Sequence, residues 1–415
     1  MADIRPFRAL RPLPDFAFRL ASRPYDVLNT EEARGEALHN PLSFYHISRS
    51  EIDLPPGTAP HSPEVYGKAA DNLQQFIRER ILLMDDSPCF YIYALTMNGK
   101  VQTGLIGLSS LDDYDRGSIK KHELTRPDKE MDRVCHILAT GAQTGNVFLA
   151  YEDHEGINQI ITDWTGSHDP VYDFQASDGI YHRLWVVDKE KIQQRVRDLF
   201  AQEVPCTYIA DGHHRAASAS IVRHTLSTEG KINSADDPAN FFLTTLFPAS
   251  QLTILEYNRV VKDLNGMDTD EFLARLSVDF TIVPGESTAM IPSAPHEFGM
   301  YLDKKWWQLK AKTGSYADNP IGVLDVTILQ EKVLDPLLGI KDPRTDDRVE
   351  FIGGIRGTGE LIKRVDNREM RVAFILYPVT IRQLFEIADK GQIMPPKSTW
   401  FEPKLRDGLV THCIR

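Results

Sequence analysis

Six consecutive residues, 210–215, carry side chains that could handle a phosphate group: Ala-Asp-Gly-His-His-Arg. An apolar run precedes them and an alanine-rich run follows, which predicts a buried strand, a turn at Gly212 and a helix. The first turn of a helix has unpaired backbone N–H groups and a partial positive charge, so it attracts anions. Arg215 could add a bidentate contact, and the two histidines are further donors. The pattern therefore predicts a site for phosphate chemistry.

Asp211 is the unusual member of this turn, because a carboxylate repels an anion unless it binds a cation or takes a proton. A Mg²⁺ ion held by Asp211 would resolve the conflict. Zinc at His213 and His214 is disfavoured, since adjacent histidines seldom face one metal and no third ligand lies at a telling spacing. A structural alternative stays open: Asp-Gly is ordinary turn chemistry, and a His-His-Arg run can be a solvated surface.

Phosphoryl transfer to a hydroxyl also needs a base that orients the acceptor. Glu123, next to His122 at the expected end of a strand, is the best candidate. The alternative for Glu123 is a surface carboxylate in a charged stretch.

Two other loops carry residues that suit an anion or a substrate. Residues 353–359 are rich in glycine, but they lack the glycine spacing and the Gly-Lys-Ser/Thr ending of a P-loop, and tight turns explain them equally well. Lys397, Ser398 and Thr399 follow two prolines that restrict the backbone. They form either a substrate loop or a packed C-terminal arm. No Gly-x-Ser-x-Gly, His-Glu-x-x-His or Gly-x-Gly-x-x-Gly motif is present.

The overall composition is that of an ordinary globular protein, with 415 residues, 42% of them hydrophobic and 26% charged. A formal net charge of -12 disfavours nonspecific binding to nucleic acid or to an anionic membrane. The longest apolar stretch, residues 89–97, is too short to span a bilayer, and four dispersed cysteines suit a reducing compartment. We therefore expect a cytoplasmic protein with a small-molecule substrate and no nucleic-acid or membrane partner. The oligomeric state is left open, a homodimer included.

Helices and strands are expected to alternate along the whole chain. This indicates a protein that mixes helices and strands, which we assign to the α+β class (mixed α/β). Helices are predicted near residues 66–83, 127–139, 188–200, 325–338 and 380–390. Strands are predicted at residues 90–95 and 101–106, joined by an Asn-Gly hairpin, and at 147–151, 181–187, 204–209, 241–246 and 372–377. We expect three regions: residues 1–115, residues 116–260 with an insertion at about 152–203, and residues 261–415.

Several short segments resemble the bacterial and archaeal domain-of-unknown-function 1015 family along nearly the whole chain. They are residues 24–27 (PYDV), 40–41 (NP), 119–123 (IKKHE), 210–215 (ADGHHR), 324–326 (LDV) and 394–399 (MPPKST). The Asp-Gly-His-His-Arg turn also looks like the phosphate-binding turn of the ParB/sulfiredoxin superfamily, which includes free L-serine kinases. In those kinases a His-Glu pair precedes the turn, and His122-Glu123 keeps that order here.

This resemblance implies a ParB/sulfiredoxin-like core between N-terminal and C-terminal α+β regions. It also implies a kinase that transfers a phosphoryl group from ATP, ADP or pyrophosphate to the hydroxyl of L-serine, giving O-phosphoserine. The chain departs from the pattern by inserting residues 152–203 and by carrying Asn258-Arg259 where the family has His-Arg. Arg259 could still bind a substrate carboxylate.

The resemblance assigns roles to named residues. Glu123 would accept the hydroxyl proton, and Asp211 would hold Mg²⁺ between donor oxygens. The predicted catalytic residues are Glu123, His122, Asp211 and His214. The predicted donor-binding residues are Gly212, His213, His214, Arg215, Lys397, Ser398 and Thr399. The alternatives are a ParB-like nucleotide-binding regulatory protein without kinase activity and a degenerate phosphate sensor.

Overall fold

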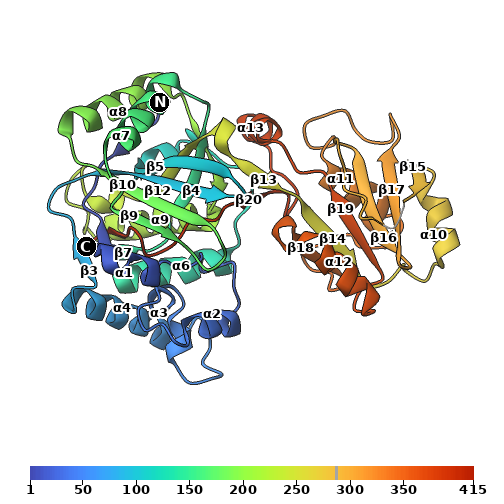
Figure 1. Cartoon of the computed structure of the whole chain (residues 1–415), viewed down its shortest axis with the longest axis horizontal. Coiled ribbons are helices and arrows are strands. Elements are labelled where there is room, and N and C mark those ends of the chain that lie inside the picture. The colour runs from blue at the N-terminus through green and yellow to red at the C-terminus, as the bar shows by residue number, and fades with distance from the viewer. Residues whose placement is uncertain (286–287) are drawn as a thin grey trace. The chain divides into compact units, whose positions relative to one another are not determined.

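The computed structural model describes residues 1–285 and 288–415, and helices and strands mix along all of them (Figure 1). The chain forms two compact units: unit 1 is Met1–Leu252 with Pro403–Arg415, and unit 2 is Thr253–Glu402. The mixed α+β class expected from the sequence is confirmed. No helix within the described residues is both long and apolar enough to traverse a membrane.

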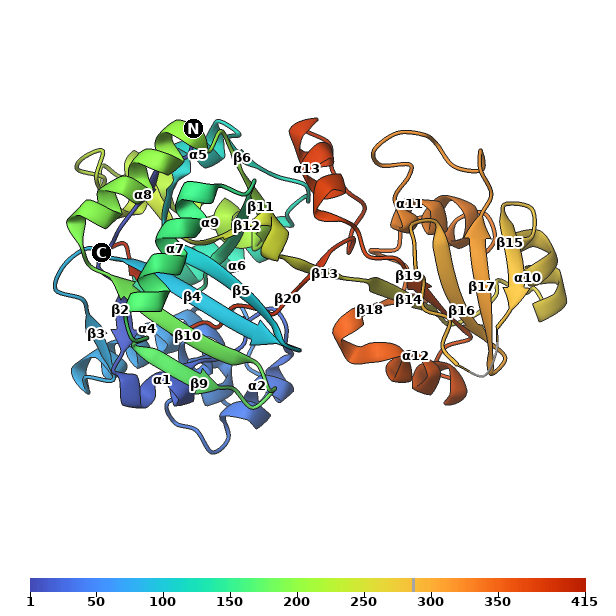
Figure 2. The same cartoon turned by 45° about the horizontal axis from the view of Figure 1, so that its top comes forward.

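Unit 1 is organised around a mixed sheet that has nine strands among the described residues, in the order β6-β11-β8-β12-β5-β4-β10-β9 with β1 paired to β5. These strands are β1 (Ile4–Arg5), β4 (Phe90–Met97), β5 (Lys100–Ser110), β6 (Ile119–Lys120), β8 (Val147–Tyr151), β9 (Tyr172–Gln175), β10 (Tyr181–Val187), β11 (Thr207–Asp211) and β12 (Phe241–Pro248). Figure 2 shows β4, β5 and β10 side by side, and β4 and β5 form the expected hairpin at Asn98-Gly99.

The sheet of unit 1 is covered by helices because its strands are apolar over most of their length. Its main core joins apolar residues of β4, β8, β10 and β12 to those of four helices: α5 (Leu111–Asp115), α7 (Glu155–Ser167), α8 (Glu190–Glu203) and α9 (His213–Thr228). Large side chains such as Phe90, Trp185 and Phe200 are at most 3% exposed, and burying each stabilises the fold by about 1.5–3 kcal/mol.

The remaining helices of unit 1 include α6, which begins with proline at Pro127 and is followed by Gly141 in the left-handed conformation. They are α1 (Pro14–Leu20), α2 (Thr30–Ala37), α3 (Tyr45–Ser48), α4 (Pro63–Arg78) and α6 (Pro127–Thr140). Helix α6 packs against α4 and α9. Two short strand pairs complete the unit: β2 (Leu10–Pro12) with β3 (Leu82–Met84), and β7 (Ala142–Gln143) with β21 (His412–Cys413).

The predicted insertion, residues 152–203, is part of this unit rather than an appended loop. It forms α7, β9, β10 and α8, and β10 pairs with β4 along its whole length. The compact units change at Leu252 and Glu402, and strands from both sides of residue 115 pair in the sheet of unit 1.

Unit 2 contains an antiparallel sheet that has six strands among the described residues, in the order β15-β17-β16-β19-β14-β18. They are β14 (Tyr257–Val261), β15 (Phe280–Pro284), β16 (Glu297–Leu302), β17 (Lys305–Ala311), β18 (Val349–Gly353) and β19 (Val372–Leu376). Helix α12 (Gly357–Asp366) buries Leu361 and Val365 against this sheet. Three more helices belong to the unit: α10 (Thr269–Leu276), α11 (Asp325–Leu329) and α13 (Ile381–Asp389).

The two ends of unit 2 pair with each other, since β13 (Thr253–Leu255) runs antiparallel to β20 (Trp400–Glu402). The helix predicted at residues 325–338 is shorter than expected. Helix α11 ends at Leu329 and continues as a π-helical turn, Gln330–Leu334. Apolar spacing alone does not distinguish these two kinds of helical turn.

Candidate functional site

The strand–turn–helix predicted around residue 212 is confirmed. Strand β11 ends at Asp211, Gly212 turns the chain with φ 96°, and α9 begins at His213. A Cβ at position 212 would lie 3.2 Å from Arg215 Nε and 3.4 Å from Val147 Cα, so glycine suits both the angle and the space. The N-cap residue of α9 is Gly212, which has no side chain that could cap the helix. The N–H groups of its first turn are therefore suited to an anion.

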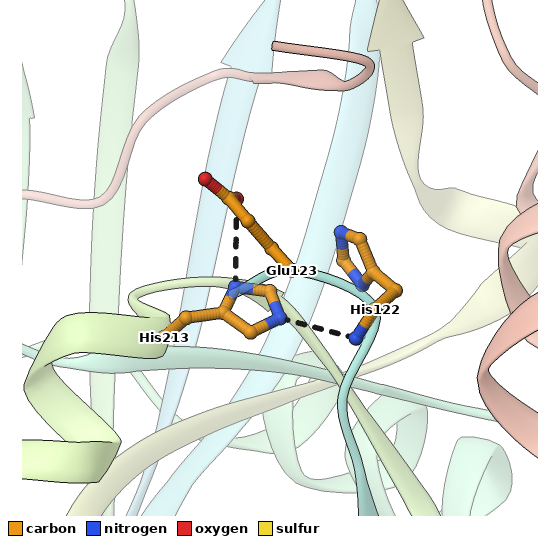
Figure 3. A group of neighbouring side chains, drawn as sticks. All are labelled: His122, Glu123 and His213. Carbon is orange, nitrogen blue, oxygen red and sulfur yellow. Dashed lines mark hydrogen bonds and ion pairs between the residues drawn. The ribbon is translucent and has the colours of Figure 1, made fainter. Parts of the chain in front are cut away.

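Glu123 and His122 lie beside this turn because of strand pairing. Strand β6, which ends at Lys120, pairs in parallel with β11, so the segments that follow both strands leave the sheet at the same edge. Figure 3 shows the Glu123 side chain next to the His213 ring, with Glu123 Oε2 3.8 Å from His213 Nδ1. The His122 backbone N–H donates to His213 Nε2 at 3.5 Å, and the two rings lie edge to face with centroids 4.5 Å apart. Residues 90 positions apart in sequence thus form one cluster.

Both imidazoles of this cluster are neutral at pH 7. Burial lowers the pKa of His122 to about 4, although Asp211 and the Ile209 carbonyl oppose the shift. Burial also lowers the pKa of His213 well below its usual value, and His122 adds to the effect. Neutral imidazoles have one N–H donor and one lone pair, so they can bind a phosphate oxygen or a metal ion but bring no charge.

His214 is held by a different contact. Its Nε2 accepts a hydrogen bond from the backbone N–H of Arg126 at 3.0 Å. The segment between β6 and α6 therefore contacts the first turn of α9 through both histidines.

Asp211 is held by cations of the chain itself. Its carboxylate lies 3.1 Å from Lys404 Nζ and 3.6 Å from Arg215 Nη2. Burial alone would raise the pKa of Asp211, but Lys404 and Arg215 lower it below its usual range. Mg²⁺ prefers several oxygen ligands, whereas the groups nearest this carboxylate are an ammonium and a guanidinium. The surroundings of Asp211 therefore do not fit a bound Mg²⁺ ion.

Arg215 is an anchor of this turn. The side chain is 8% exposed, Nη1 donates to the Asn146 carbonyl, and Nη2 lies 3.8 Å from an Asp26 carboxylate oxygen. Burial opposes the charge, while Asp26, Asp211 and Asp407 raise the pKa of Arg215 above its usual value. A bidentate contact between Arg215 and a ligand would have to compete with these groups.

The other predicted site residues, Arg259 and residues 397–399, belong to unit 2. Arg259 on β14 is 3% exposed, and its Nη2 donates to the carbonyls of Lys397 at 3.0 Å and Pro396 at 3.4 Å. Burial lowers the pKa of Arg259 to about 10. Ser398 Oγ donates to the Pro395 carbonyl at 2.6 Å. The polar groups of Arg259 and Ser398 thus hold the loop that contains Lys397 and Thr399.

Sequence reasoning missed four residues around the turn: the side chains of Lys404, Asp26 and Asp407, and the backbone carbonyl of Asn146. Asp26 lies in the segment 24–27 that supports the family resemblance, so a signal for it existed. Lys404 and Asp407 come from the last stretch of the chain and have no local pattern that relates them to Asp211.

Comparisons with known proteins give one family and several distant structures. A family model described as "Protein of unknown function (DUF1015)" matches residues 4–327. A search of curated proteins finds no match. SbnI with a C-terminal truncation, from Staphylococcus aureus, has a TM-score of 0.39 at 12% identity, covering 74% of this chain and 86% of that one.

Two more solved structures are equally distant. A conserved hypothetical protein from Pyrococcus furiosus has a TM-score of 0.33 at 14% identity, over 75% of this chain and 95% of that one. A free serine kinase in complex with AMP has a TM-score of 0.34 at 14% identity, over 75% and 92% of the two chains. Similarity at this level assigns no activity to the chain.

Proposed function

The chain belongs to the DUF1015 family of proteins of unknown function, and from the geometry of its site we propose that it is a small-molecule kinase. It would transfer a phosphoryl group from ATP, ADP or pyrophosphate to a hydroxyl group, with free L-serine as the first candidate acceptor and O-phosphoserine as the product. The ParB/sulfiredoxin-like character of the core is part of the same proposal.

One observation carries this proposal: a carboxylate lies beside the N-terminus of a long helix whose N-cap residue is glycine. Glu123 Oε2 is 3.8 Å from Nδ1 of His213, the first residue of the 16-residue helix α9. A phosphate bound by the first-turn N–H groups would lie next to a group that can accept a proton. Phosphoryl transfer to an alcohol needs that pair of functions.

The step follows from these positions. The backbone N–H groups at the start of α9, together with His213 and His214, hold the phosphoryl group that is transferred. The acceptor oxygen forms a bond to phosphorus as the bond from phosphorus to the donor oxygen breaks, and the acceptor proton passes to Glu123. Arg215 and Asp211 fix the turn, because they bind each other, Lys404 and the Asn146 carbonyl.

Two groups predicted from the sequence stay outside this mechanism. We assign no metal step to Asp211, since Lys404 and Arg215 already neutralise it. We also assign no step to Arg259 or to residues 397–399 of unit 2, because Arg259 and Ser398 bind backbone carbonyls there.

The test is a product assay with a matched pair of variants. Purified protein is incubated with L-serine, Mg²⁺ and ATP, ADP or pyrophosphate, and phosphoserine is measured by mass spectrometry. We expect product with wild type and a loss of about 100-fold or more in kcat with Glu123→Gln, which removes the proton acceptor but keeps the shape. Nucleotide affinity should stay within about threefold, since the first-turn N–H groups remain.

Glu152→Gln is the control, because Glu152 is an exposed carboxylate just after β8. It should turn over like wild type. Wild-type turnover by Glu123→Gln would show that another group is the base. Tight nucleotide binding without any phosphorylated product, across a panel of amino acids and polyols, would favour the ParB-like regulatory alternative.

A further inference from the structure

We propose that His122, Glu123 and His213 form a binding site for a divalent transition-metal ion such as Zn²⁺ or Mn²⁺. Each side chain would give one ligand atom. The role that we give the ion rests on the proposed function, because the ion would act in the same phosphoryl transfer. Binding of the ion can nevertheless be measured without turnover.

The spacing of the three side chains suits a metal ion. One potential ligand atom from each lies within 4.8 Å of the other two, and Glu123 Oε2 is 3.8 Å from His213 Nδ1. Metal–nitrogen and metal–oxygen bonds of about 2.0–2.2 Å place neighbouring ligands roughly 3–4 Å apart. Small rotations of side chains are enough to bring the three atoms to those distances. Figure 3 shows the three side chains gathered in this way.

His122 gives an independent indication of a ligand. Its side chain is 2% exposed, and within the described residues neither ring nitrogen has a hydrogen-bond partner of good geometry. A buried imidazole without partners is unfavourable, because its N–H and its lone pair have both lost water. A metal ion would use that lone pair.

The set of ligand atoms selects the class of ion. Two imidazole nitrogens and one carboxylate oxygen suit Zn²⁺, Mn²⁺ or Fe²⁺, whereas Mg²⁺ prefers oxygen ligands alone. Three protein ligands also leave coordination positions for substrate oxygens, as in catalytic metal sites. Asp211, the ligand expected from the sequence, is bound by Lys404 instead.

One contact must change when the ion binds. The His122 backbone N–H now donates to His213 Nε2 at 3.5 Å, the long limit of a hydrogen bond. If the ion takes the lone pair of Nδ1, then Nε2 carries the proton and this contact opens. The loss is small because the bond is long.

An ion at this site would lie beside the N-terminus of α9, where the proposed phosphate binds. It would neutralise part of the phosphate charge. A carboxylate has two oxygens, so Glu123 can bind the ion with one and receive the hydroxyl proton on the other.

The test is metal binding by the full chain after dialysis against a chelator. Calorimetry with Zn²⁺, with Mn²⁺ and with Mg²⁺ gives affinity and stoichiometry, and Co²⁺ absorption reports a nitrogen–oxygen ligand set. We expect one equivalent of Zn²⁺ or Mn²⁺ in wild type and no competition by Mg²⁺. Glu123→Gln and His213→Gln should each weaken binding by about 100-fold or more.

His224→Gln is the matched control, since His224 is an exposed histidine on the same helix that lies 3.3 Å from Asp115. It should bind the ion like wild type, and circular dichroism should show that all variants are folded. Absence of Zn²⁺ and Mn²⁺ binding, or equal binding by Glu123→Gln and His213→Gln, would overturn the site.

The two proposals fail in different ways. Metal binding that depends on Glu123 and His213, without any phosphorylated product, would contradict the kinase and support the metal site. Turnover at full rate with Mg²⁺ alone, in protein that binds neither Zn²⁺ nor Mn²⁺, would support the kinase and contradict the metal site.

Discussion

At the scale of single residues, the site joins neutral histidines to a buried group of charges around Arg215. That guanidinium has carboxylates on several sides, of which Asp26 and Asp211 lie within 4 Å. Asp407 belongs to the same surroundings, and Arg133 lines the same small cavity as Arg215 and Asp407. Charges buried in this way stabilise a particular arrangement of side chains, and that arrangement fixes the turn that begins α9.

Asp407 should make stability depend on pH. Burial raises the pKa of Asp407 to about 7, Asp26 adds to this, and Arg215 and Arg133 oppose it. The folded chain therefore holds this proton where the unfolded chain, with a pKa near 3.8, has released it. The contribution of Asp407 to the free energy of unfolding is therefore complete below about pH 4. It decreases as the pH rises toward 7, by up to about 1.4 kcal/mol per pH unit.

Asp407→Asn removes that dependence because an amide does not titrate. Urea unfolding of wild type and variant is measured at pH 5, 6, 7 and 8. The free energy of unfolding of the variant should rise relative to that of wild type as the pH increases. Parallel curves for the two proteins across that range would contradict the raised pKa.

At the scale of elements, the site depends on the parallel pairing of β6 with β11, and on the turn between β11 and α9. The pairing brings the segment after Lys120 to the start of α9, and Gly212 lets the chain turn within one residue. Neither the strand pairing nor the turn involves a long loop. The position of the cluster is therefore fixed by the sheet.

Gly212→Ala should disturb both fold and site. The φ of 96° is unfavourable for alanine, and its Cβ would come within 3.2 Å of Arg215 Nε. We expect a loss of about 1–3 kcal/mol in the free energy of unfolding and a lower kcat. Gly166→Ala in α7 is the control, because a Cβ there meets nothing within 4 Å. It should be neutral or stabilising by up to about 1 kcal/mol. Equal stability of the two variants in urea unfolding would contradict this account of the turn.

Sequence reasoning succeeded where the signal is local and failed where it is not. The β11–Gly212–α9 unit and the Asn98-Gly99 hairpin were predictable because turn chemistry and apolar pattern lie in one short window. Glu123 was predicted to act near the turn from its place at a strand end and from the family resemblance, but its distance to His213 depends on the pairing of β6 with β11. Lys404 was missed because nothing near position 404 points to a partner 193 residues earlier. The break in the helix after Leu329 was missed because a π-helical turn keeps an apolar face.

At the scale of the whole molecule, the chain has two units with separate apolar cores and a formal net charge of -12. An acidic chain has no general attraction for polyanions, so any anion must be bound by a local site. The start of α9, the site that we propose, would use N–H groups and neutral donors instead of a field of positive charge.

The same charge balance yields a prediction about DNA. Fluorescence anisotropy with a labelled duplex should show no binding below about 100 µM protein at roughly 150 mM salt, because the formal net charge of -12 opposes association with a polyanion. The identical assay at lower salt is the control for weak association. Tight binding that weakens steeply with salt would favour the regulatory alternative over the kinase.

The pairing of β13 with β20 means that the chain leaves unit 1 after Leu252 and comes back at Pro403. Lys404 and Asp407, which surround Asp211 and Arg215, are thus added by the ribosome only after all of unit 2. A nascent chain can fold most of its first 252 residues and still lack the amine that neutralises Asp211. The charged surroundings of Asp211 are therefore expected to be complete only after all of unit 2 has been translated.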